Sequence, residues 1–149
     1  MKLADARKRM QVLETELRQI DHQMDQLVQE FKNTYQRPWV AHPAIHRSRR
    51  EGGSVFRWRL RGFDGIGQSW LMFTSDMLQE ALSREGVPLR TRLAWLKIER
   101  RGRILTFEHR RRNYERLRLK DLVTQLQGLN ALEDRWSHIT GQGSTNGTD

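Results

Sequence analysis

Apolar residues recur at alternating intervals of three and four over the first 31 residues, with no Gly or Pro among them. Four heptads in one register predict a continuous amphipathic helix, about 45 Å long at a rise of 1.5 Å per residue. Two interpretations stay open: the helix packs on its own domain, or residues 1–36 form a coiled-coil arm that makes a homodimer. In the second interpretation the dimer seam consists of Met10, Leu13, Leu17, Ile20, Met24 and Leu27.

The periodicity changes after this helix. Pro38 disfavours helical backbone at the residue before it, so the helix should end near Gln36. Residues 37–53 contain two prolines and a Gly-Gly pair, which predict a basic loop.

The segment SVFRWRLR, residues 54–61, alternates with the period of a β-strand. A Gly-rich turn and the apolar segment 69–74 follow it, so we expect a β-hairpin. One face of the first strand should carry Phe56, Trp58 and Leu60, and the other face Arg57, Arg59 and Arg61.

The C-terminal half is expected to be helical. Thr-Ser-Asp at 74–76 predicts an N-cap for a short helix over 76–84, which Gly86 closes. Residues 96–108 fit either a second hairpin that turns at Gly102 or a continuous helix, and we favour the helix because the apolar residues beyond Gly102 lie near one helical stripe. The fold class is therefore mainly α (α+β), with a small basic domain over 54–136 and a disordered tail over 137–149.

The net charge of +9 is unevenly distributed. Residues 1–36 are neutral, residues 121–149 carry −3, and residues 37–120 carry 20 basic and 8 acidic side chains. Arginine outnumbers lysine 18 to 2 in that middle part. Because arginine binds phosphate with two hydrogen bonds and stacks on bases, this bias favours a nucleic-acid partner.

The rest of the sequence argues against disulfide-bonded, secreted and membrane-spanning proteins. The chain has no cysteine, its charged first ten residues lack the apolar segment of a signal peptide, and no apolar run is long enough to span a membrane. We therefore expect a cytoplasmic protein without membrane contact.

Two groups of arginines are candidate phosphate contacts. The first follows the hairpin and the loop before it, and the second lies on the basic C-terminal helix; a solvated, ion-paired surface is the alternative for both. The candidates are Arg47, Arg49, Arg50, Arg57, Arg59, Arg61, Arg100, Arg101, Arg103, Arg110, Arg111 and Arg112.

Five tryptophans are many for 149 residues. Trp58, Trp70 and Trp95 lie in the regular segments and are expected in the core. Trp39 and Trp136 lie outside these segments and are the candidates for base stacking.

No catalytic or metal-binding pattern is present. GFDGIG lacks the spacing of a phosphate-binding loop, and His42 and His46 have Pro43 between them and no further ligand at suitable spacing. The few acidic residues of the middle part are poor material for a nuclease metal site. We expect no enzyme activity, no metal and no cofactor.

Part of the chain resembles an uncharacterised family of integrating-conjugative-element and plasmid proteins, sometimes labelled integrase regulators. The resemblance covers residues 54–119 and departs from the family pattern at Thr106, where the family has Asn. It implies a mobile-element setting linked to conjugation, a helix that continues through Gly102, and work on or near DNA. The matching residues are Phe56, Arg57, Trp58, Arg59, Leu89, Leu93, Leu96, Glu99, Arg103 and Leu105.

The sequence thus indicates a nucleic-acid-binding accessory or regulatory protein of a mobile element, with DNA preferred over RNA and arginine–phosphate contacts as the main interaction. The alternative is an adaptor whose basic surface docks an acidic protein of a DNA-processing complex. The two hypotheses differ in whether the arginines of the hairpin contact nucleic acid directly.

Overall fold

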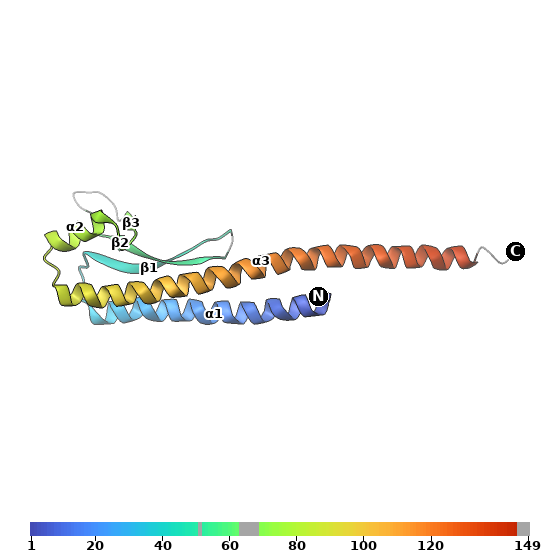
Figure 1. Ribbon diagram of the computed structural model, residues 1–149, viewed down its shortest axis with the longest axis horizontal. Coiled ribbons are helices and arrows are strands. Elements are labelled where there is room, and N and C mark those ends of the chain that lie inside the picture. Colours follow the sequence, from blue (N-terminus) through green and yellow to red (C-terminus); the bar gives the residue numbers. More distant parts are fainter. Residues whose placement is uncertain (51, 63–68, 146–149) are drawn as a thin grey trace. The chain divides into compact units, whose positions relative to one another are not determined.

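The computed structural model describes residues 1–50, 52–62 and 69–145. The chain is mainly helical, with one small sheet in the middle of the sequence (Figure 1). The elements are α1 (Leu3–Thr34), β1 (Ala41–Arg47), β2 (Ser54–Leu60), β3 (Ser69–Leu71), α2 (Asp76–Arg84) and α3 (Leu89–Thr145). The predicted fold class, mainly α with some β, is confirmed.

The chain divides into two compact units. Residues 16–113 form the core unit, and residues 1–15 together with the chain from Tyr114 onward form the terminal unit.

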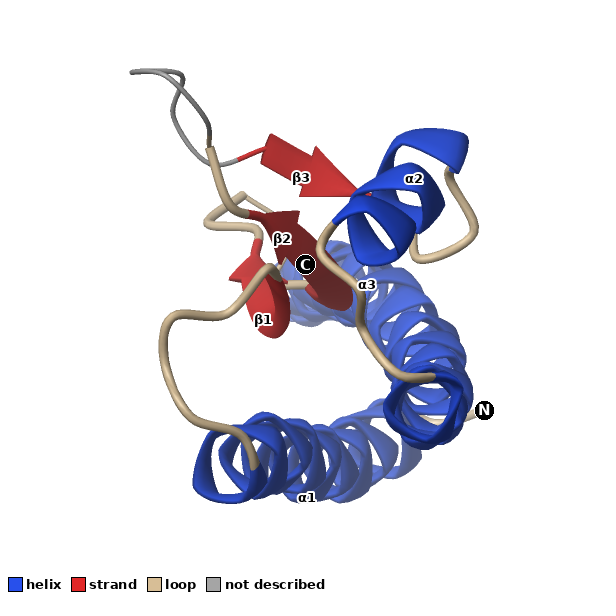
Figure 2. Ribbon diagram, turned by 90° about the vertical axis from the view of Figure 1, so that its left-hand side faces the viewer, coloured by secondary structure: helices blue, strands red, loops and turns tan. Residues whose placement is uncertain are grey.

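The sheet of the core unit is antiparallel, in the order β1-β2-β3 (Figure 2). The β2 and β3 strands are the predicted hairpin, and β2 alternates as expected, with Phe56, Trp58 and Leu60 buried. The predicted turn at 63–68 lies outside the described residues.

The β1 strand corrects the predicted loop over 37–53. Residues 41–47 pair with β2 along their whole length, and Pro43 lies opposite Trp58. A proline is tolerated here because β1 is an edge strand, paired on one side only. The link to β2 is a tight turn in which Gly52 has a φ of 70° and the Ser48 amide donates to the Gly53 carbonyl at 2.8 Å.

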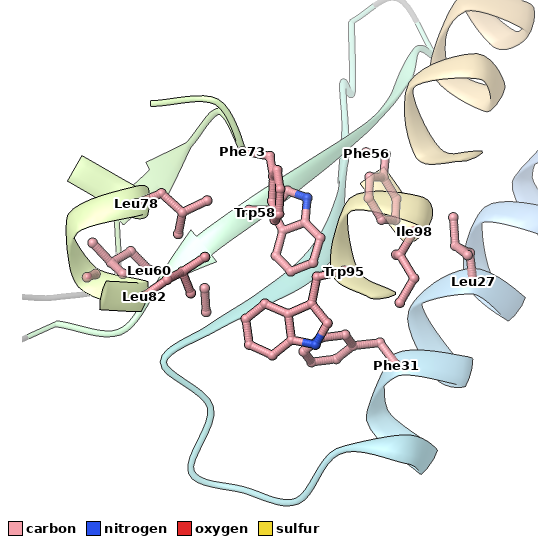
Figure 3. Close-up of a cluster of buried hydrophobic side chains, with 12 residues drawn as sticks. Leu27, Phe31, Phe56, Trp58, Leu60, Phe73, Leu78, Leu82, Trp95 and Ile98 are labelled. Carbon is pink, nitrogen blue, oxygen red and sulfur yellow. The ribbon is translucent and has the colours of Figure 1, made fainter. Parts of the chain in front are cut away.

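The core of this unit is built around Trp58, which is 1% exposed (Figure 3). Its ring lies 5.7 Å from that of Trp95 in a stacked arrangement, 4.8 Å from that of Phe73 and 5.7 Å from that of Phe31. These aromatic contacts join α1, the sheet and α3 in one cluster, to which α2 adds Leu78, Ala81 and Leu82.

The apolar side of α1 is buried inside the chain, which corrects the predicted dimer seam. In the core unit Leu17, Ile20, Met24 and Leu27 are at most 7% exposed. Ion pairs join Glu16 to Arg112 at 2.7 Å and Glu30 to Arg101 at 3.0 Å, so that α1 and α3 run antiparallel there. The chain's own residues therefore cover the stripe, as the first of the two interpretations had it.

The terminal unit has its own small core. Ala6, Leu13 and Leu119 are buried, Met10 packs partly buried against them, and Arg9 pairs with Glu115 at 2.7 Å. Leu13 and Met10 complete the expected dimer seam, so they too have partners within one chain.

The α3 helix is longer than predicted. It reaches Thr145, whereas a disordered tail was expected from residue 137 onward. The intervals of three and four continue from Leu129 through Leu132 and Trp136 to Ile139, and this spacing extends the helical pattern past 137. Residues 146–149 of the predicted tail lie outside the described residues.

The short helix and the continuity of α3 are confirmed. Ser75 caps α2 by accepting a hydrogen bond from the Leu78 amide, and Gly86 follows the helix with a φ of 66°. At Gly102, a Cβ atom would lie 2.1 Å from the Phe56 ring. The helix therefore carries a glycine because β2 packs directly against its backbone.

Candidate nucleic-acid interface

The outer sheet face is the side of the sheet turned away from the Trp58 core, and it carries His42, His46, Arg57, Arg59 and Trp70. In register, His42 lies opposite Arg59, and Arg59 lies opposite Trp70. The Arg59 guanidinium lies 4.1 Å from the Trp70 ring centroid, and that of Arg57 lies 5.9 Å from it. Two cations thus flank one aromatic ring, an arrangement that cation–π attraction stabilises.

The position of Trp70 corrects its assignment to the core. Leu71 lies opposite the buried Trp58, so its neighbour Trp70 must point to the other face. Phe73 takes the core position, at 5% exposed. The alternation within SWLMFT contained this signal, because Leu71 and Phe73 share one face and Trp70 and Met72 the other.

About half of the candidate arginines are committed to ion pairs in the core unit. Some of these pairs join α1 or a loop to another segment and others lie within α3, and both kinds support the structural alternative of an ion-paired surface. The pairs are Arg47 with Asp25, Arg61 with Glu85, Arg101 with Glu30, Arg103 with Glu99, Arg111 with Glu108, and Arg112 with both Glu16 and Glu108.

Glu108 shows the effect of this pairing on a carboxylate. The hydrogen bond from Arg112 is the main cause that lowers the pKa of Glu108, and the charges of Arg111 and Arg112 add to it against the opposing effect of desolvation. The same hydrogen bond raises the pKa of Arg112. The basic stretch 109–112 is thus partly neutralised by its own helix and by Glu16.

Five further candidate arginines are exposed and have no carboxylate partner among the described residues. Arg49 and Arg50 lie in the turn between β1 and β2, Arg57 lies on the outer sheet face, and Arg100 and Arg110 lie on α3. Arg59 is half-buried on the outer sheet face and contacts the Trp70 ring. These side chains are the cations best placed to meet a polyanion.

A groove of about 540 Å³ lies between the β2–β3 hairpin and α3. Its buried lining residues are Phe56, Trp58, Phe73, Glu99 and Thr106, whereas Phe107 and Met72 are exposed at 61% and 67%. Trp70 joins this groove to the outer sheet face. The cations that line it are Arg57, Arg103 and Arg110.

The polar atoms deep in the groove already have partners. The Trp58 Nε1–H donates to the Glu99 carboxylate at 2.6 Å, and the Arg103 Nε–H donates to the other oxygen at 2.5 Å. The Thr106 hydroxyl accepts from the Phe56 amide at 3.0 Å and donates to the Gly102 carbonyl at 2.9 Å. The groove therefore offers apolar surface and positive charge, with its deep hydrogen-bonding groups occupied.

Trp39, a candidate for base stacking, is half-buried at the end of α1. Its Nε1–H donates to the Tyr35 carbonyl at 3.0 Å, and its ring lies 5.9 Å from Phe31. The Arg37 guanidinium lies 4.8 Å from the ring centroid. Trp39 is thus held against the core unit. The other candidate, Trp136, is 62% exposed on α3 in the terminal unit.

His42 lies beside Trp39, with 5.2 Å between the ring centroids. Burial is the largest cause that lowers the pKa of His42 from 6.5, and the positive charges of Lys32, Arg59 and Arg37 lower it further. With a pKa below 6.5, the imidazole is mostly neutral at pH 7. It therefore adds little to the positive charge around it.

Ser54, Asp21 and His109 meet at a buried position that sequence reasoning did not single out. The Ser54 hydroxyl donates to Asp21 at 2.7 Å, and His109 Nε2 lies 3.2 Å from the same carboxylate oxygen. Because the hydroxyl faces the carboxylate and not the imidazole, the arrangement lacks the serine–histidine contact that activates a nucleophile. It is a structural link between α1, β2 and α3.

Sequence reasoning also missed Phe107 and Met72 at the groove. The signal was available only in part: Met72 has the same parity as Trp70 in the sequence, just after the end of β3, but the spacing of Phe107 fits a helical stripe equally well. The arginines Arg57 and Arg110, far apart in sequence, are brought to one groove by the packing of β2 on α3.

Comparisons with known proteins add no assignment. No family model matches the sequence, and no curated protein or solved structure matches it significantly. In the described part of the chain, no helix has an apolar stretch long enough to cross a bilayer, and no three metal-ligating side chains gather at one place.

Proposed function

We propose that this protein binds nucleic acid, DNA in preference to RNA, through arginine–phosphate contacts and without catalysing a reaction. The observation that carries the proposal is the outer sheet face, where Arg57 and Arg59 flank Trp70 at 5.9 and 4.1 Å. A role as accessory or regulatory protein of a mobile element is part of the proposal and depends on the resemblance over residues 54–119.

The arrangement fits a polyanion better than it fits a merely solvated surface. Arginines that serve only solubility need no fixed position, but Arg59 lies over an indole ring, and Arg57 lies near it on the same strand face. Arg49 and Arg50 extend this positive surface along the β1–β2 turn. Arginines held in place lose less conformational entropy when they bind phosphate.

The first experiment is fluorescence anisotropy with a labelled DNA strand of about 20 nucleotides and its duplex, from about 50 mM salt upward. The test variant is Arg57→Glu/Arg59→Glu, and the control is Arg90→Glu/Lys97→Glu, which changes the net charge equally at exposed positions of α3. We expect the test variant to lose at least about tenfold in affinity and to reduce the salt slope by about two.

The control variant should stay within about threefold of the unmodified protein, because its positions lie outside the proposed interface. Equal losses in both variants would show that net charge alone attracts DNA and would contradict the proposal. Absence of binding by the unmodified protein at about 50 mM salt would also overturn it and would favour an adaptor that docks an acidic protein.

A further inference from the structure

The groove between the β2–β3 hairpin and α3 exposes large apolar side chains at its mouth. Phe107 and Met72 are 61% and 67% exposed, and Trp70 lies between the groove and the outer sheet face. An apolar surface of this kind is costly in water, which indicates an occupant with an apolar or aromatic body.

The charges at the groove indicate the second property of the occupant. Arg57 and Arg110 line it without a described carboxylate partner, and Arg103 is paired with Glu99. Two cations without a carboxylate partner in the described part of the chain favour an anionic group close to the aromatic body. A nucleotide combines these two properties in one unit.

The occupied hydrogen-bonding groups show how such a ligand would be held. Trp58 Nε1 donates to Glu99, whose other oxygen accepts from Arg103, and the Thr106 hydroxyl is bonded to the backbone of Phe56 and Gly102. These groups are therefore not available to recognise a base edge. A base would bind by stacking and dispersion, with its phosphate near the arginines. Such binding tolerates any base.

We propose that the groove holds one unstacked nucleobase, with its phosphate at Arg57 and Arg110, and that the protein therefore prefers single-stranded nucleic acid to duplex. The inference depends on the proposed function and goes beyond it by naming the conformation of the ligand. The volume of the groove, about 540 Å³, lies within the range of small-ligand sites. A base in a duplex must first be unpaired and unstacked, whereas a base in a single strand reaches the groove at lower cost.

The test uses Phe107→Ala in the full chain, with Ile104→Ala as the matched control. Both side chains are exposed on α3, at 61% and 62%, but only Phe107 lines the groove. The probe is an oligothymidine of about 15 nucleotides with one 2-aminopurine in the middle, compared with the same sequence in duplex form. Affinity and 2-aminopurine fluorescence are measured together.

We expect the unmodified protein to bind the single strand more tightly than the duplex and to quench the probe. Phe107→Ala should lose about tenfold in single-strand affinity and most of the quenching, with its salt slope unchanged because no charge is removed. Ile104→Ala should match the unmodified protein.

Two further variants separate base stacking from general apolar contact. Phe107→Trp keeps an aromatic face and should retain single-strand binding, whereas Phe107→Leu keeps the bulk but not the aromatic face and should behave like Phe107→Ala. If leucine restores binding fully, the groove takes an apolar side chain such as that of an acidic peptide, and the inference is wrong.

Failure of the inference differs from failure of the proposed function. If Phe107→Ala and Ile104→Ala bind the single strand equally while Arg57→Glu/Arg59→Glu does not, nucleic-acid binding stands and the groove has no part in it. If the unmodified protein binds neither form, both proposals fall together.

Discussion

At the scale of single residues, one position along a strand separates a core side chain from a surface side chain. Trp58 and Trp70 lie on neighbouring strands, but Trp58 is opposite Leu71 and Trp70 is opposite Arg59. Trp58 is therefore buried and bonded to Glu99, and Trp70 lies under the two arginines. Successive side chains of a strand point to opposite faces of the sheet, so a shift of one residue moves a side chain from the core to the surface.

His42 gives a prediction that depends on its immediate surroundings. Its pKa is lowered from 6.5 in the folded protein, first by burial and then by the charges of Lys32, Arg59 and Arg37. Below pH 6.5 the unfolded chain therefore binds the proton more readily than the folded chain does. We expect the contribution of His42 to stability to be complete above pH 6.5 and to fall as the pH decreases from there toward the folded pKa.

An NMR titration of the His42 ring protons measures the pKa directly, and urea unfolding between pH 5 and 8 measures the effect on stability (a window chosen around the usual pKa of histidine, about 6.5). His42→Gln should flatten this part of the stability profile. A measured pKa at or above 6.5 would contradict the packing of this ring.

At the scale of elements, the heptad pattern of residues 3–31 identified a helix but not the surface that covers it. Glu16, Glu30 and Asp21 of α1 meet Arg112, Arg101 and His109 of α3, which come about 70 to 100 residues later. Heptads predict that a partner helix exists; whether it belongs to the same chain depends on the connections between them.

Gly102 and Gly128 of α3 allow a matched stability prediction. Ala is favoured over Gly in a helix by about 1 kcal/mol, so Gly128→Ala, with nothing within 4 Å of its Cβ, should stabilise the protein by up to that amount. At Gly102 the new Cβ would lie 2.1 Å from the Phe56 ring, and we expect Gly102→Ala to destabilise by about 1–3 kcal/mol.

Urea unfolding, followed by circular dichroism, measures the free energy of unfolding of both variants and of the unmodified protein. Adding Phe56→Leu to Gly102→Ala should recover part of the loss, because the smaller side chain makes room for the methyl group. Equal stabilisation by both alanines would mean that β2 does not approach the helix at Gly102.

At the scale of the whole molecule, positive charge is concentrated in one stretch of the sequence. The candidate arginines lie between Arg47 and Arg112, which is inside the core unit, and residues 121–149 are net acidic. The proposed nucleic-acid interface therefore includes neither the end of α3 nor its exposed Trp136.

A chain that ends at Gln127 tests this division. It keeps the buried residues of both units, including Leu119, and loses Trp136. We expect its DNA affinity to stay within about threefold of that of the full chain, with a slight gain because acidic residues are removed. A large loss, measured by the same anisotropy experiment, would instead assign base stacking to Trp136.

The sequence by itself determined the local features: the helical period of α1, the alternation of β2, the cap of α2 at Ser75 and the concentration of arginines. Each of these depends on residues within a few positions of one another, so the pattern alone predicts it.

Only the tertiary structure decided the features that join distant segments. In the folded chain Arg47 pairs with Asp25 and Arg112 with Glu16, so fewer arginines are available to a ligand. Residues 41–47 form a strand because they pair with β2. The tertiary structure also brought Phe107 and Arg110 to the groove beside Trp70. These contacts depend on how strands and helices are aligned across long separations in the chain, and that alignment is determined by the packing of the whole core around Trp58.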